Sequence, residues 1–160
     1  MKKAILALVL SALFAPAGLS AQTPDVSAPI RQFIDGFNKG DTKSAFAAYS
    51  SGNIAIIDEF APYHWVGPNA AHGWADDFQK MAEATGVTDG NVKYGKTKRT
   101  EIAGDSAYVI IPTVYTFKQK GKPLVEEGQM TFALHSESGV WKITAWTWSG
   151  VKPHPPTPKM

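Results

Sequence analysis

Residues 54–74 read IAIIDEFAPYHWVGPNAAHGW, and this stretch is the most informative part of the chain. It begins with a short apolar run that ends in two acidic residues, Asp58 and Glu59. A turn of proline and aromatic residues follows, and a Gly-Pro pair at positions 67 and 68 then favours the start of a helix. The stretch therefore predicts two short strands and, after them, a helix.

Two further helices are predicted before this stretch. Apolar side chains recur over residues 30–37 at the i, i+3, i+4 and i+7 spacing of one helix face. Gly40 is suited to end that helix, because glycine readily adopts the left-handed conformation found there. Asp41 can then cap a second short helix that continues to about Tyr49.

Strands dominate the second half of the chain. β-branched and aromatic runs predict four strands, at about residues 91–103, 106–118, 123–136 and 140–149. Short segments of glycine, aspartate, serine and lysine separate these four strands as hairpin turns. Helices that come first and an antiparallel meander that comes last are typical of the α+β class.

This order of elements resembles the NTF2-like (SnoaL-like) superfamily, which includes nuclear transport factor 2 and, more distantly, the steroid delta-isomerases. The resemblance implies a cone-shaped α+β fold, in which three N-terminal helices pack on a curved, mostly antiparallel sheet. Members of the superfamily bind small, largely apolar molecules between the helices and the sheet. The resemblance covers the domain that we expect at residues 22–150.

The two ends of the chain are expected to lie outside that domain. Residues 1–21 predict a secretory signal peptide, in which two lysines precede a short apolar segment and Ala17 or Ala21 fits the cleavage site. A proline and a glycine interrupt the apolar run before it reaches the ~20 residues that a membrane span requires. We therefore expect an exported protein, periplasmic or secreted, without a stable membrane anchor after cleavage. Residues 151–160 are rich in proline and predict a disordered tail.

Charge and cysteine content exclude several classes of partner. Removing Lys2 and Lys3 with the signal peptide lowers the 16 basic residues to 14, which equals the number of acidic residues. A chain with no net charge does not favour nucleic acid or an anionic membrane as its partner. Because the chain has no cysteine, neither a disulfide nor lipid attachment at a cysteine is available.

Asp58 is the first candidate for a functional residue. It shares strand parity with Ile54 and Ile56, so its side chain faces inward if theirs are buried. Glu59, the next residue, is expected to point to the opposite face. A buried carboxylate is costly unless it is paired, hydrogen-bonded or protonated. Two interpretations stay open: Asp58 is a general base, or it accepts backbone N–H groups of the following turn.

The steroid isomerases permit a comparison residue by residue. They carry a general-base aspartate at the end of this strand, and Asp58, nine residues before Gly67, looks like that position. Their oxyanion-hole tyrosine corresponds to Phe33, which has no hydroxyl, and their second acid falls near Thr131. With one of the three groups present, we do not expect steroid isomerase activity.

Tyr63 and His64 are candidate assisting groups beside Asp58, because histidine is a natural base at neutral pH. They have opposite strand parity, and the pattern favours Tyr63 and Trp65 pointing inward and His64 outward. The four histidines of the chain lack metal-ligand spacing, so we expect no metal site, and nothing in the sequence indicates a cofactor.

An apolar pocket with an inward carboxylate is the expected functional site. Its predicted ligand-binding residues are Phe33, Phe37, Trp65, Trp74, Tyr115 and Thr131. Three functions stay open: an exported domain that binds a small apolar molecule, a lyase or isomerase that uses Asp58 as general base, and a non-catalytic accessory or structural domain. Whether the protein is an enzyme is left undecided by the sequence.

Trp146 and Trp148 share strand parity with Lys142, whose side chain requires water. This pattern predicts two large aromatic side chains on the outer face of the sheet, and exposed aromatic groups of that size usually mark a contact surface. We therefore expect a homodimer through the outer sheet face. A second packing layer, or a β-bulge that shifts the strand register, is the alternative explanation.

Overall fold

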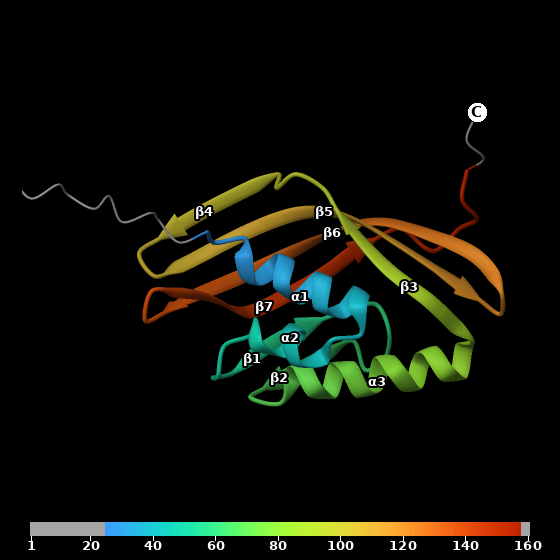
Figure 1. The fold of residues 1–160 in the computed structure, drawn as a ribbon, viewed down its shortest axis with the longest axis horizontal. Coiled ribbons are helices and arrows are strands. Elements are labelled where there is room, and N and C mark those ends of the chain that lie inside the picture. The colour runs from blue at the N-terminus through green and yellow to red at the C-terminus, as the bar shows by residue number, and fades with distance from the viewer. Residues whose placement is uncertain (1–24, 158–160) are drawn as a thin grey trace, which may run out of the picture.

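Three helices lie on the concave side of a long curved sheet in the computed structural model, which describes residues 25–157 (Figure 1). The predicted signal peptide falls outside these residues. The helices are α1 (Ala28–Lys39), α2 (Thr42–Ala47) and α3 (Ala70–Thr85). The strands are β1 (Ile54–Ile57), β2 (His64–Gly67), β3 (Val87–Tyr94), β4 (Arg99–Ala103), β5 (Ser106–Gln119), β6 (Lys122–Glu137) and β7 (Val140–Gly150).

The strands form one sheet in the order β2-β1-β7-β6-β5-β3, and β4 also pairs with β5. All pairs are antiparallel except β1 with β7, which is parallel. This mostly antiparallel sheet with three helices confirms the predicted α+β class and the cone-shaped NTF2-like fold. None of the described helices is long and apolar enough to cross a membrane.

The helix ends follow the local sequence signals. Gly40 ends α1 with a left-handed φ of 67°, and Gly86 ends α3 with a φ of 72°. The carboxylate of Asp41 accepts a hydrogen bond of 3.0 Å from the backbone N–H of Ser44, which caps α2 as predicted. The apolar stripe of α1 is buried against the sheet, with Ile30, Phe33 and Ile34 each less than 5% exposed.

The single strand predicted at residues 91–103 is two strands, β3 and β4, that pair with different parts of β5. Pro112 of β5 lies opposite the interruption and accepts a hydrogen bond of 2.9 Å from the backbone N–H of Gly95. A proline has no N–H to give in return, so the ladder on this side of β5 lacks one donor at Pro112. The break between β3 and β4 lies beside this missing donor.

A β-bulge in β7 decides where its tryptophans lie. Ala133 of β6 pairs with Ala145, whereas the next residue, Leu134, pairs with Ile143, so Thr144 is an extra residue in β7. The extra residue reverses the parity of the rest of the strand, and Ile143 and Trp146 are both buried, at 0% and 4% exposure.

The placement of Trp146 and Trp148 on the outer sheet face is therefore wrong. Both side chains face the helices, and the alternative of a register-shifting bulge explains the sequence pattern. A homodimer remains a prediction, but these two residues do not supply its surface. Sedimentation velocity at micromolar concentration distinguishes dimer from monomer.

The proline-rich C-terminal segment also differs from the predicted disordered tail. His154 and Val125 exchange two backbone hydrogen bonds of 2.9 and 3.0 Å, and the N–H of Val151 donates to the carbonyl of Glu127 at 3.1 Å. Residues 151–154 thus continue along the edge of β6 where β7 ends. The sequence pattern conceals this pairing because prolines flank His154, whose own N–H stays available.

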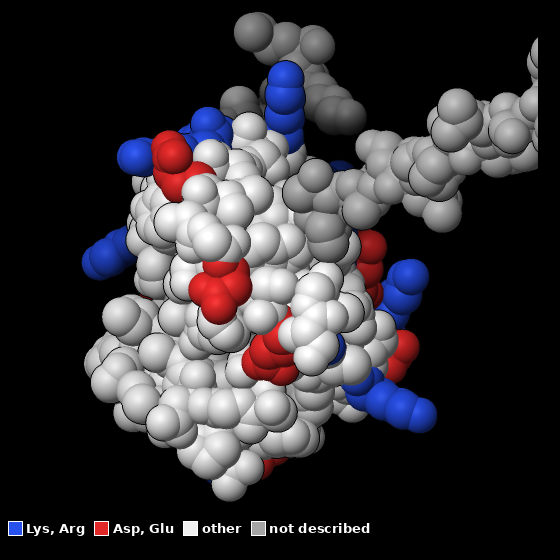
Figure 2. Space-filling view, turned by 90° about the vertical axis from the view of Figure 1, so that its left-hand side faces the viewer, with Lys and Arg blue, Asp and Glu red and all other residues white. Residues whose placement is uncertain are grey.

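Charged side chains are interspersed on the surface that Figure 2 presents. Most of this face is uncharged, and its lysine and arginine side chains do not gather into one patch.

Candidate functional site

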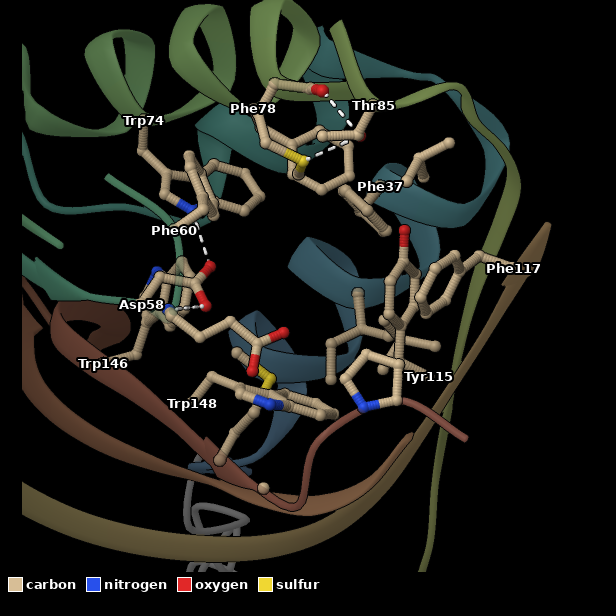
Figure 3. Close-up of a pocket in the computed structure, with 18 of the residues that line it drawn as sticks. Phe37, Asp58, Phe60, Trp74, Phe78, Thr85, Tyr115, Phe117, Trp146 and Trp148 are labelled. Carbon is tan, nitrogen blue, oxygen red and sulfur yellow. Dashed lines mark hydrogen bonds between the residues drawn. The ribbon is translucent and has the colours of Figure 1, made fainter. Parts of the chain in front are cut away.

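A cavity of about 460 Å³ lies between the helices and the concave face of the sheet (Figure 3). Aromatic rings from α1, α3, the end of β1 and the long strands form most of its wall. These rings belong to Phe33, Phe37, Phe60, Trp74, Phe78, Tyr115, Phe117, Trp146 and Trp148. The cavity is therefore largely apolar, with few polar groups among the side chains that face it.

Five of the residues predicted for the site lie in the cavity wall. The structure brings together Phe33, Phe37, Asp58, Trp74 and Tyr115. In Figure 3, Asp58 and Tyr115 face the cavity from opposite sides, and Trp74 and Phe60 lie beside Asp58.

Trp65 and Thr131 do not line the cavity, which corrects their prediction as ligand-binding residues. Trp65 is buried, but its Nε1 donates a hydrogen bond of 3.0 Å to Oδ2 of Asp77, and its ring packs against Phe60. Thr131 alternates with Met130 and Phe132, which are buried on the concave face, so its side chain has the opposite parity.

Tyr63 and His64 also lie away from the cavity, so the structure does not support them as assisting groups. His64 is exposed on β2, as its parity predicts. The inward orientation predicted for Tyr63 is wrong, because this residue is 59% exposed and has a left-handed φ of 69°. The strand begins only at His64, so the period-two rule does not extend to Tyr63.

Asp58 accepts hydrogen bonds, as one of the two interpretations predicts, and it also lines the cavity. Its Oδ1 accepts a hydrogen bond of 2.8 Å from the backbone N–H of Glu59, and its Oδ2 accepts one of 2.8 Å from Nε1 of Trp74. The same carboxyl lines the cavity. Burial raises the pKa of Asp58 to about 6, although the hydrogen bond from Trp74 acts in the opposite direction.

Glu59 lines the cavity as well, which corrects the prediction that it points away from Asp58. β1 ends at Ile57, so the alternation of strand faces no longer applies to the two acidic residues. Burial and, next, the neighbouring carboxyl of Glu126 raise the pKa of Glu59 to about 8.

Glu126 is a third carboxyl at the site, and it is completely buried in β6. Its Oε1 accepts a hydrogen bond of 2.8 Å from Nε1 of Trp148, whereas its Oε2 has no partner among the described residues. Sequence reasoning missed Glu126, although the signal was present. Counting back two residues from Gly128, on the face shared with Met130, gives Glu126 on the concave side.

Tyr115 is a further polar group in the cavity wall. It pairs with Glu126 in the register of β5 and β6, and its hydroxyl oxygen is buried without a hydrogen-bond partner among the described residues. Burial, followed by the charges of Glu126 and Asp58, raises the pKa of Tyr115 to about 12. The phenol is therefore a neutral donor at physiological pH.

The C-terminal segment forms part of the cavity wall through Val151, Lys152 and Pro153. His154 fixes the segment to β6, because its Nε2 lies 2.7 Å from Oε2 of Glu127 and its backbone pairs with Val125. Within residues 25–157, no three acidic or histidine side chains are arranged to hold a metal ion.

Comparison with known proteins agrees with this geometry. The SnoaL-like domain family matches residues 26–152. The comparison with curated proteins gives no match.

Three solved structures illustrate the shared fold. A ketosteroid isomerase-like protein from Erwinia carotovora atroseptica is 21% identical, with a TM-score of 0.62 over 80% of this chain and 95% of that one. A hexachlorocyclohexane dehydrochlorinase is 14% identical, with a TM-score of 0.67 over 81% and 88%. An NTF2-like superfamily protein from Salmonella enterica serovar Typhimurium is 14% identical, with a TM-score of 0.64 over 82% and 89%. At these identities the likeness concerns the fold alone, and the family match carries the assignment: the chain belongs to the SnoaL-like domain family of the NTF2-like superfamily.

Proposed function

We propose that this protein binds a small, largely apolar molecule in the cavity between its helices and its sheet. The observation that carries the proposal is the aromatic cavity of about 460 Å³ with the carboxyl of Asp58 in its wall. Ligand pockets commonly measure roughly 300–1,000 Å³ and combine apolar walls with a few placed polar groups. A purely structural domain would be expected to fill this space with its own side chains.

The rings around the cavity are held in place without a ligand. Trp146 donates a hydrogen bond of 2.8 Å from Nε1 to the hydroxyl of Tyr49, and Trp74 is held in the same way by Asp58. The rings of Trp74 and Trp146 meet edge to face at 5.2 Å, and Phe33 packs against both. A wall that is already ordered loses little conformational entropy when a ligand enters.

Fluorescence titration with N-phenylnaphthylamine tests the proposal, because this neutral dye becomes bright in an apolar site. We expect saturable binding to the purified protein and loss of binding in Val87→Trp, which places an indole in the cavity wall. Val66→Trp is the matched control, since Val66 is 62% exposed and lies outside the cavity. Equal binding by the two folded variants would contradict the proposal.

Proton transfer by Asp58 is a second candidate function. The pKa of about 6 favours it, because a general base works best when its pKa lies near the operating pH. The fold also occurs in a protein named as a hexachlorocyclohexane dehydrochlorinase. Ring opening of nitrobenzisoxazole, a general probe of carboxylate bases in apolar sites, tests this function. We expect Asp58→Asn to retain dye binding and to lose the ring-opening rate, and an unchanged rate would exclude Asp58 as the base.

Export is proposed on the sequence of residues 1–21 alone. A fusion of the chain to alkaline phosphatase, which is active only outside the cytoplasm, tests it. Activity that disappears when residues 2–21 are deleted would support export, and activity that is absent from the full-length fusion would contradict it.

A further inference from the structure

We propose that the ligand of this cavity carries a positively charged organic group, which lies between the aromatic rings and the carboxyls of Asp58, Glu59 and Glu126. This inference rests on the proposed binding function and specifies the chemical class of the ligand. It predicts an amphiphilic amine or quaternary ammonium compound rather than a neutral or anionic one.

The three carboxyls gather at one side of the cavity. Asp58 and Glu59 line it directly. The Glu126 carboxyl lies behind Trp148 and Gly150, which are both lining residues: a Cβ atom at Gly150 would stand only 2.9 Å from Oε1 of Glu126. Among the described residues, none of the three carboxyls forms an ion pair.

The hydrogen-bond geometry of Glu126 also favours a positively charged ligand. The residue is 0% exposed, and its Oε2 receives no hydrogen bond from any described residue. A buried carboxyl oxygen without a partner is unfavourable and is rare in folded proteins. A ligand with a positive charge in the adjacent cavity would offset this cost, whereas an anionic ligand would add to it.

The aromatic wall favours an organic cation over a metal ion. Trp74 and Phe78 stack with their centroids 5.6 Å apart, and Trp148 lies on the other side of Asp58 (Figure 3). The face of an aromatic ring attracts a cation that comes within about 6 Å of its centroid. The described carboxyls, in contrast, are not arranged to hold a metal ion.

Cation binding should displace protons from the site. Burial raises the pKa of Asp58 to about 6 and that of Glu59 to about 8, so at neutral pH the cluster retains bound protons. A positive charge beside these carboxyls lowers their pKa values and expels the protons, so affinity should increase with pH. The other titratable groups around the cluster are Tyr49 and Tyr115, with Lys152 in the outer wall.

Two probes of the same shape test the inference: phenyltrimethylammonium and tert-butylbenzene differ only in a charged nitrogen in place of a carbon. Each is titrated against the dye-loaded protein. We expect the cation to displace N-phenylnaphthylamine at a roughly tenfold lower concentration than the neutral probe. This advantage should grow between about pH 5.5 and pH 8. Calorimetry in two buffers of different ionisation enthalpy should show proton release for the cation alone.

Variants separate charge from shape. Glu126→Gln and Glu59→Gln should each reduce the advantage of the cation at least threefold and leave tert-butylbenzene unchanged. Asp76→Asn, which removes an exposed carboxylate on α3, should have no effect. If Glu126→Gln does not fold, Glu59→Gln still tests the inference. Glu59 is partly exposed at the cavity, so its substitution should not prevent folding.

The outcomes distinguish this inference from the proposed function. Dye binding with equal or stronger displacement by tert-butylbenzene would overturn the cationic ligand and leave a neutral-ligand site. Failure of both the dye and phenyltrimethylammonium to bind would overturn the binding function and this inference with it.

Discussion

The indole of Trp74 donates a hydrogen bond of 2.8 Å from Nε1 to Oδ2 of Asp58, and this contact joins the N-terminal half of α3 to the residue that follows β1. The contact links the Asp58 carboxyl to the aromatic wall of the cavity. Both residues are held by the contact, so the position of the carboxylate depends on the packing of α3. The behaviour of Asp58 is therefore a sensitive test of the whole site.

Trp74→Phe should raise the pKa of Asp58 above its value of about 6. Burial raises this pKa and the hydrogen bond from Trp74 lowers it, so loss of the donor leaves burial less opposed. The measurement is an NMR titration of the side-chain carboxyl carbon in the wild-type protein and the variant. A wild-type midpoint near ~3.9, the value of an unperturbed aspartate, would contradict the description of a buried carboxyl.

Asp58→Asn should change how stability depends on pH. Because the folded-state pKa of Asp58 is raised above that of the unfolded chain, the folded state binds the proton more tightly. Its contribution to stability is therefore present at low pH and is lost as pH rises from about 4 to about 6. Relative to the variant, the wild-type free energy of unfolding should fall on the order of 2–3 kcal/mol over this window.

Urea denaturation at a series of pH values measures this difference. Asp76→Asn, at an exposed position of α3, is the control and should give a curve parallel to that of the wild type. Parallel curves for Asp58→Asn as well would show that Asp58 titrates alike in the folded and unfolded chain.

The C-terminal segment should control how fast a ligand leaves the cavity. Val151 and Pro153 line the cavity, and His154 holds the segment through Glu127. The hydrogen bond to Glu127 raises the pKa of His154, so the contact is complete while His154 is protonated and Glu127 is ionised, and it weakens as pH rises through the raised pKa of His154. We expect dissociation of N-phenylnaphthylamine to accelerate as pH rises through that pKa.

Stopped-flow release of the dye measures this effect. His154→Ala should release the dye several-fold faster than the wild type at about pH 6 and should remove the pH dependence. His135→Ala is the matched control, because His135 faces Asp105 at 3.8 Å and does not line the cavity. Identical release rates in His154→Ala and the wild type would mean that the segment does not cover the entrance.

Much of the fold follows from local signals that can be read in the sequence. The stripe of α1, the caps at Gly40 and Asp41 and the hairpin turns each depend on a few neighbouring residues. Phe33 and Trp74 are predictable at the cavity for the same reason, since each follows from the period of one helix.

The remaining errors arise where one element depends on another. Pro112 lies in β5, but its effect is the break between the neighbouring strands β3 and β4. The proline-rich C-terminal segment is ordered because it pairs with the edge of β6. Glu126 is different, because its parity is readable but a charged residue is rarely assigned to a core. The buried acid is the partner of one of the misplaced tryptophans of β7, since Trp148 donates to Glu126.

Deleting Thr144 should preserve the native fold, because Thr144 is the extra residue of the bulge. Without it, Ile143 and Ala145 become neighbours and still pair with Leu134 and Ala133, so the ladder becomes regular. Trp146 and Trp148 keep their inward orientation, and Trp148 can still donate to Glu126. We expect a cooperative thermal transition and retained binding of N-phenylnaphthylamine.

Thr144→Ala is the matched control, since it keeps the residue count and removes only the hydrogen bond of 3.1 Å from Oγ1 of Thr144 to the carbonyl of Ala133. Its stability should fall by about 1 kcal/mol, as for the loss of one hydrogen bond, with dye binding retained. Circular dichroism and tryptophan fluorescence compare the two variants. A deletion variant that does not fold, or that folds without binding the dye, would mean that the last strand needs the extra residue to place its tryptophans.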